Sequence, residues 1–222
     1  MIKGVILDGD GTILDSMQIW DSFAQECLED LGLPEDGLKP GELENASLKD
    51  AAKLFIERFG LQKTEEEMLA FFLAKLRSIY ANEIRMINGA PEFLAELERR
   101  NIPAVIATAG DGECVRSVLR RYGLEQTCDG VFDCKSVSIG KTDPAMYNLA
   151  RESMNLAKDE VMVFEDALYA LETAWDNGYP CIAICTPDER DYEQKKAHSL
   201  LTMPDYLHLD AFWAMCEEKS DD

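Results

Sequence analysis

The sequence predicts an α/β protein in which a parallel sheet is covered by helices on both faces, with an all-helical segment inserted after the first strand. From about residue 87 onward, short apolar runs alternate with helical patterns, as in sheets built from strand–helix–strand units. Another apolar run, at residues 5–7, stands alone near the N-terminus. Between them, from about residue 16 to residue 84, the pattern is helical and contains no convincing strand.

The alternating part of the chain divides into recognisable elements. Strands are predicted at residues 5–7, 103–108, 131–132, 161–164 and 181–184. Helices are predicted from Gly89 onward, over residues 115–122 and 144–154, and up to residues 177–178. We therefore expect residues 1–14 and 87–222 to form one α/β domain, and residues 15–86 to form a helical domain inserted into it.

The helical insertion carries its own start and stop signals. We expect Asp15 or Ser16 to cap a first helix that stops near Gly32. A second helix is predicted to open at residue 47. Thr64, followed by three glutamates, has the pattern of a capping box for a third helix.

Composition narrows the possible partners. With 22 basic and 43 acidic side chains among 222 residues, the formal charge is −21. Such a charge repels nucleic acid and anionic membranes, so we expect neither as a partner, and any phosphate site needs a local positive charge. No run approaches a membrane span, and no signal-peptide pattern precedes the first strand, so we expect a cytoplasmic protein. We also expect a monomer or at most a weak dimer. The seven scattered cysteines contain no C-x-x-C and are expected to be mostly small core residues.

The first predicted strand ends in two carboxylates, Asp8 and Asp10, separated by Gly9 and followed by Gly11. Residues two apart in an extended chain point to the same side, so both carboxylates can face one small volume beyond an exposed strand tip. They repel each other unless a cation or a shared proton lies between them. The glycines let the backbone approach a ligand, and the N–H groups of such a turn suit an anion. A metal next to an anion suggests phosphate, although most Asp-Gly pairs are ordinary turns.

Three later segments add polar groups at other strand ends. Thr108 closes the second predicted strand, and Glu165 and Asp166 close the fourth. Lys141 lies in a loop before a predicted helix. Because ligands of open α/β sheets bind beyond the carboxyl ends of the strands, we expect these groups to converge. Carboxylates suit Mg²⁺, and a lysine supplies the positive charge that phosphate requires.

In their order along the chain, residues 8–12, Thr108, Lys141 and residues 165–166 resemble the four motifs of the haloacid dehalogenase superfamily. The similarity is to its branch with a helical cap, which includes phosphoglycolate phosphatases and β-phosphoglucomutases. It implies a Rossmann-like core with a central first strand, dependence on Mg²⁺ and phosphoryl transfer through an aspartyl phosphate. Ala167, Ala170 and Thr142 depart from the usual Ser, Gly and Pro of the branch, at positions that affect packing more than chemistry.

The resemblance assigns roles to these residues. Asp8 would be the nucleophile and Asp10 the general acid and base. Mg²⁺ would be held by the side chains of Asp8 and Asp166 and by the backbone carbonyl of Asp10. Glu165 would orient these ligands. The groups expected to hold the phosphate oxygens are the side chains of Thr108 and Lys141 and the backbone N–H groups at Gly9 and Ala109.

The expected function is therefore Mg²⁺-dependent hydrolysis of a small phosphomonoester. A phosphohexose mutase is the alternative, and a catalytically silent binding protein is a third. The helical insertion would be a lid over the site. Trp20 and Leu48 fall where the mutases carry a histidine and an arginine, which favours the phosphatase. Trp20 could stack on a substrate or belong to the core of the insertion, and both possibilities stay open.

Overall fold

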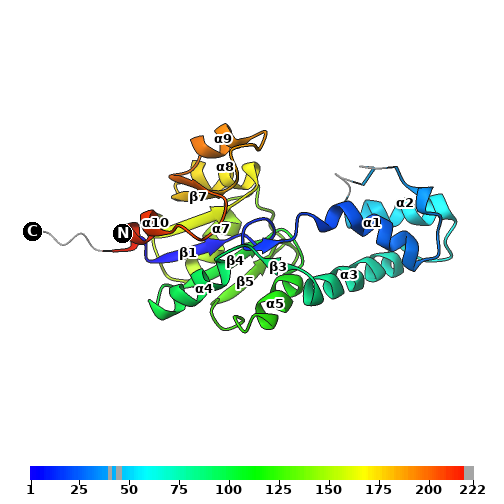
Figure 1. The fold of residues 1–222 in the computed structure, drawn as a ribbon, viewed down its shortest axis with the longest axis horizontal. Coiled ribbons are helices and arrows are strands. Elements are labelled where there is room, and N and C mark those ends of the chain that lie inside the picture. The colour runs from blue at the N-terminus through cyan, green and yellow to red at the C-terminus, as the bar shows by residue number, and fades with distance from the viewer. Residues whose placement is uncertain (40–41, 44–46, 218–222) are drawn as a thin grey trace, which may run out of the picture. The chain divides into compact units, whose positions relative to one another are not determined.

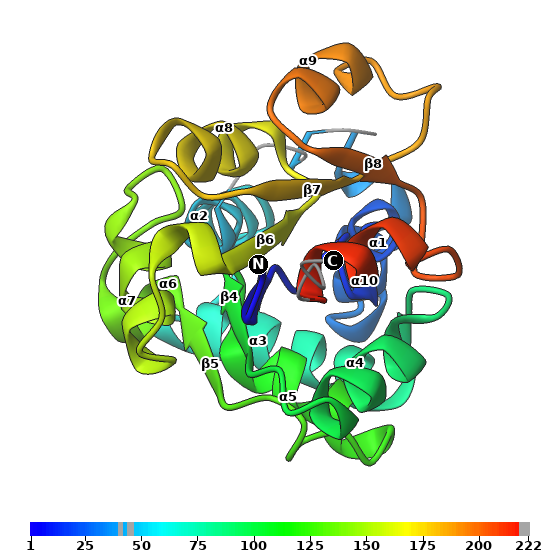
Figure 2. The ribbon, with the colours of Figure 1, turned by 90° about the vertical axis from the view of Figure 1, so that its left-hand side faces the viewer.

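A six-stranded parallel sheet forms the centre of the larger of two units in the computed structural model, which describes residues 1–39, 42–43 and 47–217. The larger unit consists of Met1–Asp15 and Ile84–Asp222, and the smaller one is Ser16–Glu83. The strand order is β5-β4-β1-β6-β7-β8 (Figures 1 and 2). These strands are β1 (Gly4–Leu7), β4 (Ala104–Thr108), β5 (Gly130–Asp133), β6 (Val161–Glu165), β7 (Cys181–Ile184) and β8 (Leu201–Met203). The predicted Rossmann-like α/β core, with the first strand inside the sheet, is confirmed.

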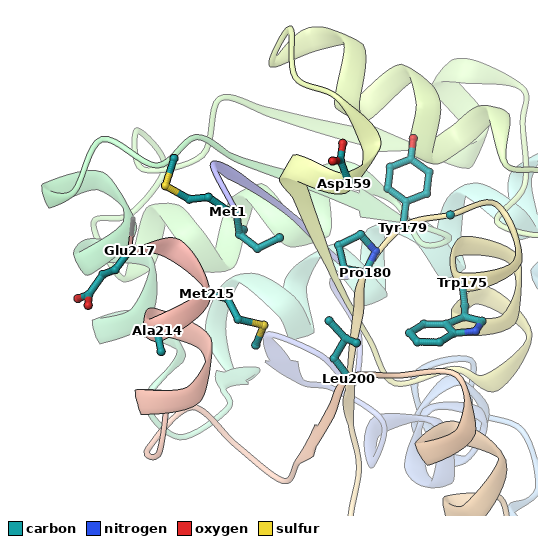
Figure 3. Close-up of a pocket in the computed structure, with 11 residues that line it drawn as sticks. Met1, Asp159, Trp175, Tyr179, Pro180, Leu200, Ala214, Met215 and Glu217 are labelled. Atoms are coloured by element: carbon teal, nitrogen blue, oxygen red, sulfur yellow. The ribbon is translucent and has the colours of Figure 1, made fainter. Parts of the chain in front are cut away.

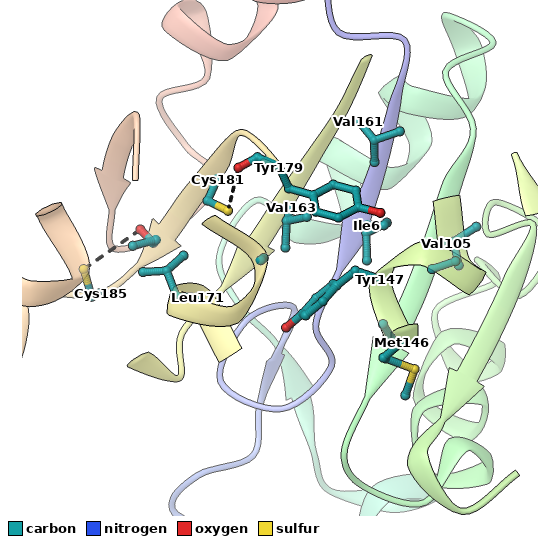
Figure 4. Close-up of a cluster of buried hydrophobic side chains, with 14 residues drawn as sticks. Ile6, Val105, Met146, Tyr147, Val161, Val163, Leu171, Tyr179, Cys181 and Cys185 are labelled. Atoms are coloured by element: carbon teal, nitrogen blue, oxygen red, sulfur yellow. Dashed lines mark hydrogen bonds between the residues drawn. The ribbon is translucent and has the colours of Figure 1, made fainter. Parts of the chain in front are cut away.

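Helices cover both faces of this sheet, as Figure 2 shows. On one face, Ile6 and Val163 pack with Tyr147 of α7 and Leu171 of α8 (Figure 4). On the other face, the ring of Phe164 lies 5.3 Å from that of Phe93 in α4 and 5.3 Å from that of Phe212 in α10. The helices of this unit are α4 (Ala90–Arg99), α5 (Gly112–Arg121), α6 (Cys134–Val137), α7 (Ala145–Ser153), α8 (Leu168–Asp176), α9 (Tyr192–Ala197), α10 (Asp210–Cys216) and the 3₁₀ turn η2 (Lys158–Glu160).

All the regular elements among the described residues of the smaller unit are helices. The unit comprises α1 (Ile19–Asp30), the 3₁₀ turn η1 (Glu35–Gly37), α2 (Leu48–Phe59) and α3 (Glu65–Asn82). Phe72 joins the helices, because its ring lies 5.8 Å from that of Phe23 in α1 and 5.2 Å from that of Phe55 in α2. Such edge-on aromatic contacts add to the stability that burial of the rings supplies.

Two of the three predicted helix starts in this unit are correct. The Ser47 side chain accepts from the Asp50 N–H, and Thr64 forms a reciprocal capping box with Glu67. The expectation that Asp15 or Ser16 caps the first helix was wrong. Helix α1 begins later, with Gln18 at the N-cap position and no side-chain hydrogen bond there. Backbone bonding of the preceding turn, from the Ile19 N–H to the Ser16 carbonyl, takes the place of a side-chain cap.

Several short elements were not predicted. Strand β2 (Leu14–Asp15) pairs antiparallel with β3 (Arg85–Met86), and β8 adds a parallel edge strand beside β7. Strands of two or three residues are too short for a hydrophobic period to appear. The seven cysteines, all among the described residues, form no disulfide, and Cys27, Cys114, Cys181 and Cys185 are buried. Among the described residues, no helix combines the length and apolarity needed to cross a membrane.

Candidate active site

The carboxyl ends of β1, β4 and β6 bring the predicted polar residues to one edge of the sheet. Asp8 directly follows β1, and its N–H donates to the Phe164 carbonyl of β6 at 3.0 Å. Glu165 ends β6 and Thr108 ends β4. Because Leu7 pairs with Phe164 in the parallel register, the next residues of the two strands, Asp8 and Glu165, lie at the same level.

Lys141 comes to this edge from the loop before α7. Its Nζ donates to Asp8 Oδ1 and, at 2.5 Å, to Glu165 Oε1. The Lys141 side chain is only 2% exposed, so water can stabilise little of its positive charge. The two carboxylates therefore provide almost all of the compensation for that charge. Burial alone would lower the pKa of Lys141, but the attraction of Asp8 and Glu165 outweighs it and raises the pKa above its ordinary value. The lysine therefore stays charged.

Three carboxylates form a compact cluster of oxygen donors. One oxygen from each of Asp8, Glu165 and Asp166 lies within 4.8 Å of the other two. Burial, and then the charge of Glu165, raises the pKa of Asp166 to about 7. Burial also raises the pKa of Asp8 well above its ordinary value, against the opposing effect of Lys141. A divalent cation with a preference for hard oxygen ligands would relieve this repulsion, so the donor set fits Mg²⁺.

Gly11 allows Asp166 to reach the cluster. Its φ of +80° is a backbone conformation that favours glycine, and a Cβ at this position would overlap the Asp166 carboxylate. Thr12 follows, and its hydroxyl donates to Asp166 Oδ1 at 3.3 Å. Gly11 and Thr12 therefore determine where the Asp166 carboxylate lies. From the sequence, this glycine was expected to let the backbone approach a ligand, whereas the structure shows that it makes room for Asp166.

Asp10 lies on the side of the site near the end of β4. A Cβ built on Gly110 would be 2.9 Å from Asp10 Oδ2 and 3.4 Å from Thr108 Oγ1, so both side chains border this glycine. The Thr108 hydroxyl accepts from the Gly110 N–H at 3.0 Å, which leaves its proton available to another acceptor. Ala109, between them, is exposed.

Asp8 was expected at an exposed strand tip, and this was wrong: it is 6% exposed, because Lys141 and Glu165 lie against it. Gly9 is buried, and a Cβ there would lie 3.3 Å from Thr108 Oγ1, so the backbone passes close to the threonine. Trp20 belongs to α1, but its side chain lies outside the described residues.

Tyr147 was not singled out from the sequence. Its hydroxyl lies 3.1 Å from Glu165 Oε1 and 3.1 Å from the Ala170 carbonyl. In the sequence it is one apolar position of a helical repeat, and no signal separates it from an ordinary core tyrosine. Its distance of six positions after Lys141 becomes informative only once the helix is placed against the sheet.

A large, mostly apolar pocket of about 1010 Å³ lies away from the candidate active site (Figure 3). Its lining includes Ile2, Asp159, Tyr179 and Leu200, which precede strands β1, β6, β7 and β8. It therefore occupies the amino ends of the strands, whereas ligands of open α/β sheets bind at the carboxyl ends. None of the predicted site residues lines it.

Comparisons with known proteins identify the family and the fold of the chain. The sequence profile of haloacid dehalogenase-like hydrolases matches residues 5–184. The chain is 26% identical to validoxylamine A 7′-phosphate phosphatase of Streptomyces hygroscopicus subsp. limoneus over 86% of this chain and 89% of the relative. It is 28% identical to hexitol phosphatase A of Escherichia coli over 83% and 84%, respectively. A solved Thermotoga maritima structure assigned as a β-phosphoglucomutase has the same fold, with a TM-score of 0.79 and 20% identity over 96% of this chain and 99% of that one.

Proposed function

Because the chain belongs to the haloacid dehalogenase-like hydrolases and is a phosphoric monoester hydrolase of that family, we propose that it is a Mg²⁺-dependent phosphatase that acts through an aspartyl phosphate on Asp8. The observation that carries this proposal is the buried contact of Asp8 with Lys141 beside the carboxylate of Asp166. A nucleophilic carboxylate, a fixed cation for the phosphate and a set of oxygen ligands for a metal then lie within one small volume.

In the first half of the reaction, the Asp8 carboxylate attacks phosphorus. A bond forms between an Asp8 oxygen and phosphorus while the ester P–O bond breaks, and its electron pair leaves with the alkoxide oxygen. Asp10 gives this oxygen a proton. The position of Asp10 beside Gly110 and Thr108 supports the assignment, since the acid must border the phosphate site without being the nucleophile.

In the second half, water attacks the phosphorus of the aspartyl phosphate. The water proton goes to Asp10, the bond between Asp8 and phosphorus breaks, and inorganic phosphate leaves. The same residue thus acts first as acid and then as base, and the enzyme returns to its starting protonation state.

The residues around the phosphate stabilise the charge that spreads over its oxygens. Lys141 supplies a positive charge that the net charge of −21 does not. The Thr108 hydroxyl and the backbone N–H groups at Gly9 and Ala109 are proposed as further donors. Asp8 and Asp166, with Glu165 behind them, would hold Mg²⁺, which when bound neutralises charge on the phosphoryl group.

We propose a phosphorylated sugar or polyol as the substrate, because the Streptomyces and E. coli relatives are named for a validoxylamine phosphate and for hexitols. Residues 15–86 are proposed to act as a cap domain that selects the leaving group, on a core of residues 1–14 and 87–222. The substrate itself stays open between members of this class.

In the described part of the helical unit, Lys75 and Arg58 are each paired with carboxylates, whereas Lys49 and Lys53 stay available, so the mutase remains the alternative that product analysis decides. A mutase must hold a second phosphate while the first is transferred, which requires an available cation. Lys75 pairs with Asp30 at 2.7 Å and with Glu26 at 3.2 Å. Arg58 pairs with Glu42 at 2.5 Å. Lys49 and Lys53 are exposed.

The test is a phosphatase screen over sugar and polyol phosphates, each assayed with Mg²⁺ and with EDTA. We expect phosphate release from at least one substrate with Mg²⁺ alone. β-Glucose 1-phosphate with a catalytic amount of the 1,6-bisphosphate separates the alternatives. Free phosphate without glucose 6-phosphate supports the phosphatase, and faster accumulation of glucose 6-phosphate would establish a mutase. A lack of turnover and of phosphate binding would leave only the binding protein.

A further inference from the structure

Tyr147 links the core of the larger unit to the candidate active site. The residue is 1% exposed and belongs to the apolar cluster between the sheet and helices α7 and α8 (Figure 4). Its ring packs among apolar side chains, whereas its hydroxyl lies 3.1 Å from Glu165 Oε1. A buried phenol requires a hydrogen-bond partner, and here that partner is one of the clustered carboxylates.

The same oxygen of Glu165 accepts a second hydrogen bond. Lys141 Nζ donates to it at 2.5 Å, while also donating to Asp8. Within the described part of the chain, the other oxygen, Glu165 Oε2, has no hydrogen-bond partner in the protein. The direction of the Glu165 carboxylate is therefore set by two donors on one oxygen, one neutral and one charged.

The phenol oxygen also lies near the chain beyond Asp166, where a second acceptor shares its single proton with Glu165. Its oxygen lies 3.1 Å from the Ala170 carbonyl in the first turn of α8. Glu165 immediately precedes Asp166, and Ala170 follows it by four positions. One hydroxyl thus lies near a side-chain oxygen of the residue before a candidate metal ligand and near a backbone carbonyl four positions after that ligand.

We propose that Tyr147 is a positioning residue that sets how the Lys141 charge is divided between Glu165 and the phosphate site on Asp8. Hydrogen bonding from the phenol satisfies part of the acceptor capacity of Glu165. Without it, Lys141 would be the only donor to that carboxylate, and Glu165 would draw the ammonium away from Asp8. This inference rests on the proposed function, because it concerns charge that acts on the transferred phosphoryl group.

Tyr179 provides a matched control. It lies in the same apolar cluster and is also 1% exposed, and its ring centroid is 6.1 Å from that of Tyr147. Its hydroxyl, however, donates to Asn148 Oδ1 at 2.8 Å. Tyr179→Phe therefore removes the same atom from the same core without touching a carboxylate of the site.

The experiment compares Tyr147→Phe and Tyr179→Phe in the full chain. The readouts are kcat and KM with p-nitrophenyl phosphate and Mg²⁺, the Kd of inorganic phosphate by calorimetry, and urea unfolding without metal. We expect Tyr147→Phe to lower kcat about tenfold and to weaken phosphate binding, since a hydrogen bond to a charged group contributes on that scale. Tyr179→Phe should keep kcat and Kd close to wild type.

A second pair of variants separates positioning from a loss of folding. In the Glu165→Gln background, adding Tyr147→Phe should lower kcat much less than it does in the wild type, because the effect passes through that carboxylate. Equal losses in both backgrounds, or equal kcat and Kd for the two phenylalanine variants, would overturn the proposal. An inactive wild type that binds no phosphate would instead contradict the proposed function.

Discussion

Lys141 Nζ and Asp8 Oδ1 form a buried ion pair between residues 133 positions apart in the chain. One partner follows the first strand, and the other precedes α7, so folding of the whole sheet is needed to create it. A buried pair of this kind is costly to break, because removal of one partner leaves the other charge without compensation. In the proposed mechanism, stability and catalysis therefore depend on the same contact.

Replacement of Lys141 by methionine is expected to affect both properties. The metal-free protein should lose about 3 kcal/mol of unfolding free energy, because Asp8 and Glu165 would remain buried without their cation. Phosphatase turnover should fall by at least about a thousandfold. Lys135→Met is the control, since Lys135 is exposed. Urea unfolding and steady-state rates of the two variants measure the difference, and equal stabilities would show that the pair contributes nothing.

Gly11→Ala should disturb the metal site specifically. A Cβ at Gly11 would overlap the Asp166 carboxylate and would also strain a backbone with a φ of +80°. The control is Gly123→Ala, because Gly123 has a φ of +72° but no heavy atom within 4 Å of the added carbon. Both variants should lose about 1 kcal/mol of stability from the backbone alone. Only Gly11→Ala should also weaken Mg²⁺ binding, as measured by calorimetry; equal Mg²⁺ affinities would contradict the proposed role of Asp166.

The stabilisation by Mg²⁺ should depend on pH. Burial and the charge of Glu165 raise the pKa of Asp166 from 3.8 to about 7, so the folded metal-free protein binds this proton more tightly than the unfolded chain does. The contribution of Asp166 to the unfolding free energy therefore falls as the pH rises across that interval. Bound Mg²⁺ favours the ionised carboxylate, so the gain in unfolding free energy on adding Mg²⁺ should grow as the pH rises across the same interval.

Urea unfolding with Mg²⁺ and with EDTA, at several pH values, measures this gain. Asp166→Asn is the matched control, because it has no carboxyl group to titrate at this position. Its gain should be smaller and should change less with pH. A wild-type gain that stays constant from about pH 5 to pH 8 would contradict the assignment of Asp166 as a ligand.

The sequence predicted the parts of the fold and site that depend on local patterns. Asp8, Thr108 and Glu165 were found because each ends an apolar run, and parallel strands bring such ends to one edge. Thr64 was identified because a capping box occupies four consecutive positions.

Features set by long-range packing were not accessible in the same way. The burial of Asp8 depends on Lys141, whose position is fixed only when α7 packs on the sheet. Tyr147 looks like any apolar helix position until its hydroxyl meets Glu165 across the core. The edge strand β8 is held by its register with β7 rather than by a hydrophobic period of its own.

In the proposed mechanism, Asp8 carries the phosphoryl group during turnover. Rapid acid quenching of the enzyme with substrate and Mg²⁺, followed by borohydride reduction and peptide mass spectrometry, tests it directly, because reduction converts an aspartyl phosphate to homoserine. We predict homoserine at position 8 in the wild type and its absence when substrate or Mg²⁺ is omitted. Steady turnover with the modification at another carboxylate, or at none, would contradict the mechanism.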